Sequence, residues 1–98
     1  MYARVNRFHD QPEAMEAAER LVVDKIVPQL QTVPGFVGVL SLVERTTGRS
    51  LGITFWETEE AMRASEAEAN RLRGDISDAA GSEIRSVERY EVNLRVGL

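Results

Sequence analysis

The sequence lacks cysteine altogether and contains a single histidine, His9. Without cysteine the chain cannot form disulfides, thiolate metal sites or iron–sulfur clusters, and it has no cysteine nucleophile. One histidine is too few for a typical transition-metal site, which needs several nitrogen or sulfur ligands. The run from Gly35 to Gly38 matches neither a dinucleotide fingerprint nor a phosphate-binding loop. We therefore expect no metal site and no cofactor.

Long apolar runs are also missing. No stretch approaches the ~18–20 residues of a membrane span, and the N-terminus lacks the apolar core of a signal peptide. We therefore expect a cytoplasmic protein with no membrane partner. The basic residues are scattered and the formal net charge is −4, which argues against nucleic acid as a partner. With 98 residues, the chain is sized for a single domain over residues 1–98 with one modest core.

The first half of the sequence predicts a strand, a helix and a second strand. Residues 2–8 alternate, with Ala3 and Val5 between polar side chains. A helix is expected next, capped by Asp10 and ending or kinking at Val27, before Pro28. Its apolar side chains recur every three or four residues (Met15, Ala18, Val22 and Ile26). Residues 36–43 are apolar at nearly every position, as in a strand covered on both faces.

The second half repeats this order after a tight connection over residues 46–49. Residues 51–56 predict a third strand, and Thr58 is the expected cap of a second helix. One face of that helix carries small and apolar side chains (Met62, Ser65, Ala69 and Leu72). The structure of the stretch between Gly74 and Gly81 stays open at this point. Residues 84–96 predict a long closing strand with Tyr90 and Val96 on one face.

The resulting order is β-α-β-β-α-β. It predicts an α+β, ferredoxin-like fold, with a four-stranded antiparallel sheet and two helices on one face. Two helices cover only one face of such a sheet, yet residues 36–43 are apolar on both faces. Leu51, Ile53 and Phe55 also lie on the face opposite Trp56. We therefore expect a homodimer in which two sheets pack face to face as an α/β barrel.

Three segments resemble the antibiotic biosynthesis monooxygenase (ABM) family of dimeric α/β-barrel proteins. They are Val33–Gly38 (VPGFVG), Phe55–Ala61 (FWETEEA) and Val87–Val92 (VERYEV). The resemblance spans nearly the whole chain and implies the dimeric barrel. It also implies activities that range from cofactor-free oxygenation of phenols and quinols to haem degradation. The haem-degrading branch uses a Trp and a His on the second helix; here neither residue occurs between Ala61 and Arg73.

Five residues are candidates for the site that the resemblance implies. Asn6 either satisfies neighbouring backbone or donates to a substrate oxyanion. Trp56 packs in the core or the dimer interface, or alternatively forms a flat wall against an aromatic substrate. Met62 either fills the core or lines the same pocket. His9 and Tyr90 are candidate proton carriers, with a surface histidine and a packed aromatic as the alternatives.

These residues lead to two hypotheses. The first is a cofactor-independent monooxygenase of a small aromatic or quinol-like substrate, with Asn6, His9 and Tyr90 as catalytic residues and Trp56 and Met62 as substrate-binding residues. The second is a non-catalytic, ligand-binding or stress-associated dimer whose pocket holds a small aromatic or apolar molecule.

Overall fold

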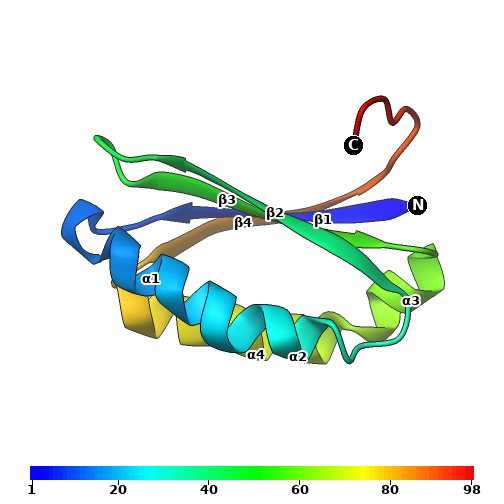
Figure 1. Ribbon diagram of the computed structural model, residues 1–98, viewed down its shortest axis with the longest axis horizontal. Coiled ribbons are helices and arrows are strands. Elements are labelled where there is room, and N and C mark those ends of the chain that lie inside the picture. Colours follow the sequence, from blue (N-terminus) through cyan, green and yellow to red (C-terminus); the bar gives the residue numbers. More distant parts are fainter.

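The computed structural model describes all residues 1–98 and has the predicted β-α-β-β-α-β order. Four strands, β1 (Tyr2–His9), β2 (Phe36–Glu44), β3 (Arg49–Trp56) and β4 (Glu83–Glu91), form one antiparallel sheet in the order β2-β3-β1-β4. The helices cover one face of this sheet, and the opposite face is left without helices (Figure 1). The ferredoxin-like α+β fold is therefore confirmed. No helix is both long and apolar enough to cross a membrane.

The first helical stretch continues past the position where Pro28 was expected to end or kink it. A short 3₁₀ turn, η1 (Pro12–Ala14), leads into α1 (Met15–Leu21), then a π-helical segment, η2 (Val22–Ile26), and α2 (Val27–Leu30). Proline has no amide proton for an α-helical hydrogen bond. The wider π turn, in which the Val27 amide donates to the Val22 carbonyl, accommodates this loss.

The second helical stretch consists of α3 (Glu59–Ala64) and α4 (Glu66–Ala80). Thr58 caps α3 as predicted, because its hydroxyl oxygen accepts a hydrogen bond of 3.0 Å from the Ala61 amide. Gly74 lies inside α4, so the stretch left open by the sequence is helical up to Ala80. Gly81 then ends the helix with a left-handed backbone, φ 59°.

Two sequence predictions of local structure are wrong. Strand β4 ends at Glu91, so residues 92–98 do not continue it to Val96, and Leu94 and Val96 are exposed. Asp10 does not cap the first helix. Instead, its carboxylate accepts hydrogen bonds from the hydroxyls of Ser50 and Ser82, and thereby joins the end of β1 to β3 and to the residue before β4.

The core lies between the sheet and the helices. Its central cluster consists of five buried side chains, Ile26, Leu30, Trp56, Met62 and Leu72. Arg4, Asn6 and Phe8 on β1 point toward the helices, whereas the alternate residues Ala3 and Val5 belong to the opposite face. The polar side of β1 is therefore the side that is buried.

The face without helices is apolar, as the sequence indicates. Leu40 and Leu42 on β2 are 40% and 47% exposed in the single chain. The register places them beside Ile53 and Leu51 on β3, which lie on the same face. An apolar sheet face of this kind fits the predicted packing against a second sheet, and the dimer stays a prediction.

Candidate functional site

A small cavity lies between the sheet and the helices. Its volume is about 60 Å³, and its polar walls come from Arg4 and Asn6 on β1, Thr54 on β3 and Arg73 on α4. Gly52 on β3 and Leu72 on α4 also line it. The antiparallel register pairs Arg4 with Thr54 and Asn6 with Gly52, which sets these positions side by side at the floor of the cavity.

Arg4 is the most deeply buried charged residue of the site, with 1% of its surface exposed. Its Nη2 donates hydrogen bonds to the Met62 carbonyl at 2.7 Å, the Ser65 hydroxyl at 2.9 Å and the Glu66 carboxylate at 2.9 Å. Its Nε and Nη1 are buried and have no acceptor within the protein. Arg4 therefore joins β1 to the junction of α3 and α4 through one edge of its guanidinium and leaves the other nitrogens unmatched.

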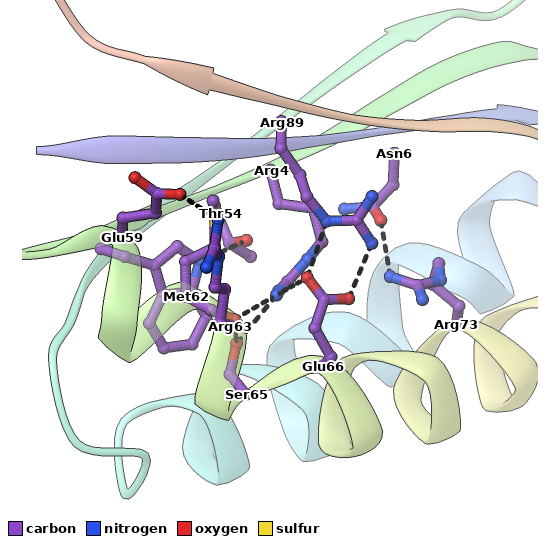
Figure 2. Close-up of polar contacts among 11 residues, drawn as sticks. Arg4, Asn6, Thr54, Glu59, Met62, Arg63, Ser65, Glu66, Arg73 and Arg89 are labelled. Atoms are coloured by element: carbon purple, nitrogen blue, oxygen red, sulfur yellow. Dashed lines mark hydrogen bonds and ion pairs between the residues drawn. The ribbon is translucent and has the colours of Figure 1, made fainter.

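Glu66, in the first turn of α4, links Arg4 to Arg89 on β4 (Figure 2). Arg89 donates to both carboxylate oxygens, at 2.7 Å each. The hydrogen bonds from Arg89 and Arg4 lower the pKa of Glu66 to about 2, although partial burial acts in the opposite direction. Glu66 is therefore ionised at neutral pH and is the carboxylate that balances these guanidiniums.

Asn6 and Arg73 form the second polar pair of the site. Each is 8% exposed. The Asn6 Nδ2 donates to the Gly52 carbonyl at 2.8 Å, and the Arg73 Nη1 donates to the Asn6 Oδ1 at 3.1 Å (Figure 2). No carboxylate contacts Arg73 at ion-pair distance. Burial lowers the pKa of Arg73, and repulsion by Arg4 lowers it further, although a guanidinium remains charged at neutral pH.

Trp56 and Met62 lie one layer away from the cavity, in the hydrophobic cluster. Trp56 is fully buried, and its Nε1 donates to the Thr54 hydroxyl at 3.0 Å. The Arg4 Cζ is 5.5 Å from the centroid of the Trp56 ring, a cation–π arrangement. Met62 is buried and reaches the site through its carbonyl. Both residues therefore support Arg4, and neither lines the cavity.

His9 and Tyr90 lie away from the cavity. The His9 Nε2 is 2.9 Å from the Thr47 carbonyl, and its Nδ1 is 3.3 Å from Arg85, at the end of β1 beside the β2–β3 turn. Tyr90 is 52% exposed. Because the neighbouring Arg89 reaches toward α4, Tyr90 points to the other face of the sheet. Of the five candidates from sequence, only Asn6 lines the cavity.

The sequence pattern did not indicate the three arginines of the site (Arg4, Arg73 and Arg89) or Glu66. Arg4 shares its strand face with Asn6 and Phe8, and Phe8 is the signal that this face is buried. Arg73 follows Leu72, next to the small and apolar side of α4. No group of three or more His, Asp or Glu side chains is arranged to hold a metal ion.

The arrangement supplies hydrogen-bond donors with positive charge in an otherwise apolar setting. Arg4, Arg73 and Asn6 all present N–H groups, and a low dielectric strengthens their interaction with a negatively charged oxygen. The chemistry available at this cavity is therefore the binding and stabilisation of an oxyanion.

Comparison with known proteins identifies curated relatives by sequence. The chain is 43% identical over 94 residues to the uncharacterized protein Rv2558 of Mycobacterium tuberculosis, and the match covers 96% of this chain and 39% of that protein. The chain thus spans about two-fifths of the length of the curated relatives that it matches.

Two solved structures share its fold. The cofactor-independent oxygenase SnoaB of Streptomyces nogalater has a TM-score of 0.69 at 20% identity, with 99% of this chain and 97% of SnoaB covered. The heme-degrader MhuD of Mycobacterium tuberculosis has a TM-score of 0.74 at 23% identity, with 99% of this chain and 100% of MhuD covered. The family model described as "Antibiotic biosynthesis monooxygenase" matches residues 1–73. The chain therefore belongs to the antibiotic biosynthesis monooxygenase family.

Proposed function

We propose that this protein is a monooxygenase that acts on a small aromatic or quinol-like substrate without metal or flavin. Family membership supports monooxygenase chemistry. SnoaB, which shares the fold, is described as a cofactor-independent oxygenase. The observation that supports a site for this chemistry is the group of buried hydrogen-bond donors around the cavity, Arg4, Asn6 and Arg73.

These donors fit the electronic demand of such a reaction. A phenol that loses its proton becomes an electron-rich anion, which can transfer electrons to O₂. Oxidation of a phenol to a quinone consumes one O₂, places one oxygen atom in the new carbonyl and releases the other as water. The substrate supplies all the electrons, so the protein has to bind the anion, exclude bulk water and direct protons.

The roles of individual residues follow from their positions. Asn6 lines the cavity and donates to the substrate oxygen, while Trp56 and Met62 shape the apolar wall behind Arg4. His9 and Tyr90 remain the proposed proton carriers. Both lie outside the cavity of a single chain, so their role requires contact with substrate or water at the sheet end or across the dimer interface.

Oxygen consumption with a panel of phenols and quinols tests the proposal. We expect substrate-dependent uptake of one O₂ per molecule oxidised, with quinone formation followed by absorbance. Asn6→Ala should lose most of this activity, whereas Asn70→Ala, which changes an exposed asparagine on α4, should keep it. Equal rates for the wild type and Asn6→Ala would remove Asn6 from the mechanism. No uptake with any compound would count against the monooxygenase.

A second candidate function is a non-catalytic ligand-binding dimer. Its support is that the buried donors around the cavity can hold an oxyanion without any reaction. Native mass spectrometry of the freshly purified protein, followed by denaturing analysis of released molecules, separates the two. A bound aromatic compound that raises the melting temperature but consumes no O₂ supports the binder. The same spectrum tests the dimer, and a monomer would overturn the proposed barrel.

Haem degradation is not proposed, because the residues present do not fit a haem. A haem iron is usually held by a protein side chain such as histidine. The single histidine, His9, contacts Thr47 and Arg85 instead of facing the cavity.

A further inference from the structure

The cavity between the sheet and the helices has more positive than negative charge around it. Arg4 and Arg73 are both more than nine-tenths buried, and both line the cavity. Glu66 is the carboxylate in contact with Arg4, and it is shared with Arg89. Arg73 contacts only the neutral amide of Asn6. Two cations therefore line the cavity, and the one carboxylate that contacts Arg4 is shared with a third cation, Arg89.

Such an arrangement is costly unless something else balances it. A buried charge without a counter-charge is strongly unfavourable, and buried N–H groups require acceptors. In Arg4, Nε and Nη1 have no acceptor within the protein. Only Nη2 is used for its hydrogen bonds to Met62, Ser65 and Glu66. The unmatched donors call for a ligand that brings negatively charged oxygen atoms.

We infer that Arg4 and Arg73 form an oxyanion site, and that the substrate of the proposed monooxygenase is an aromatic acid bound as its anion. That the bound anion is a substrate rests on the proposed function. The chemistry recognised is an oxygen anion attached to an aryl ring, which either a carboxylate or a phenolate supplies. Planar guanidiniums match such groups because they present N–H donors in a fixed fork.

The space next to the site indicates where the ring lies. A second cavity of about 60 Å³ adjoins the first, and Phe8, Gly52 and Ile76 line both. A cavity that holds benzene measures roughly 150 Å³. Either cavity alone is therefore large enough for an oxyanion but too small for a ring. The two together measure about 120 Å³, so a bound ring also requires the Phe8 side chain, which lines both, to move; the ring would then lie against Gly52.

Gly52 provides a direct way to block that place. A Cβ added there would lie 3.8 Å from a Phe8 ring carbon, which is an ordinary contact, and the backbone is not in the left-handed region. Gly52→Ala should therefore fold normally and occupy the space of the ring. The control is Gly38→Ala on β2, where an added Cβ meets nothing within 4 Å.

Calorimetric and thermal-shift titrations with benzoate, nitrate and 4-nitrophenol test the inference, with benzamide as the neutral analogue. We expect saturable binding of benzoate and nitrate and no binding of benzamide. Arg73→Gln should weaken benzoate binding roughly 10- to 100-fold, as expected for loss of a charge-assisted hydrogen bond. Arg73→Lys should recover part of the affinity. Arg20→Gln, at an exposed position on α1, should have no effect.

Two further readouts are independent of the folding of these variants. In the wild type, the NMR signal of the Arg4 Nε–H should shift on addition of benzoate. Binding should also lower the apparent pKa of 4-nitrophenol, because the site prefers the phenolate. If benzoate binds but the pKa of 4-nitrophenol does not change, the anion that the site recognises is a carboxylate. A third readout uses a variant: Gly52→Ala should weaken benzoate binding more than nitrate binding.

The inference fails if benzamide binds as well as benzoate, if Arg73→Gln leaves the affinity unchanged, or if no anion binds. These outcomes are distinct from failure of the proposed function. Anion binding without any O₂ consumption removes the monooxygenase and leaves the oxyanion site. O₂ consumption with neutral substrates, and no anion binding, removes this inference alone.

Discussion

Replacement of Glu66 by glutamine tests the electrostatic account of the site. The change keeps the shape of the side chain but removes the negative charge shared by Arg4 and Arg89. The pKa of Glu66 falls from 4.5 in the unfolded chain to about 2 in the folded protein. At about 1.4 kcal/mol per tenfold change, this sets a ceiling of about 3.5 kcal/mol on the stabilisation. Glu66 is 33% exposed, so screening reduces the expected value to about 2 kcal/mol.

The pH dependence gives this prediction its sign. Because the pKa of Glu66 is lower in the folded state, its contribution is complete above about pH 5 and disappears as the pH falls from 4.5 toward 2. Urea denaturation at fixed protein concentration should therefore place Glu66→Gln about 1 M below the wild type at pH 7. The difference between the two midpoints should fall to less than half of its pH 7 value near pH 3 and should vanish only toward pH 2.

The matched control is Glu16→Gln, in an exposed pair with Arg20 on α1. It should change the free energy of unfolding by less than ~0.5 kcal/mol at any pH. A Glu66→Gln effect that is the same at pH 7 and pH 3 would show that the carboxylate acts through packing. An effect below ~0.5 kcal/mol at pH 7 would refute the ion network as a stabilising element.

Three other changes should have measurable effects. Gly74→Ala, inside α4, should raise the free energy of unfolding by about 1 kcal/mol, because glycine is a poor helix former. In calorimetry the melting temperature should rise by about 4–8 °C. An unchanged or lower melting temperature would indicate that the position needs glycine. Trp56→Phe should lower the free energy of unfolding by about 1–3 kcal/mol in urea denaturation, since it removes the hydrogen bond to Thr54 and weakens the contact with Arg4. An unchanged free energy of unfolding would contradict the supporting role given to this tryptophan. Leu42→Glu, on the sheet face without helices, should shift the protein from dimer to monomer in sedimentation equilibrium. If the dimer forms with unchanged affinity, the interface lies elsewhere.

The order of elements and the fold class could be predicted from the sequence because they depend on local patterns. Alternation in residues 2–8, the nearly continuous apolar run of 36–43 and the cap at Thr58 each fix an element through nearby residues. The ends of elements were less predictable. Pro28 does not end its helix because a π turn absorbs the missing hydrogen bond, and β4 ends at Glu91 although the apolar alternation continues.

The sequence also singled out Asn6 and Trp56, and both side chains are buried in the structure; their roles at the site stay predictions. It did not indicate Arg4 or Arg73. An arginine in a short alternating strand normally belongs to the exposed face, and the alternation by itself does not say which face is buried.

The tertiary structure decided that question. The helices cover the face of β1 that carries Arg4 and Asn6, and α4 brings Glu66 and Arg73 to them from more than sixty residues away. Local patterns thus determined the strands, the helices and their order. The charged cavity arises only when the sheet and α4 pack together, because its charge balance depends on residues that are distant in the sequence.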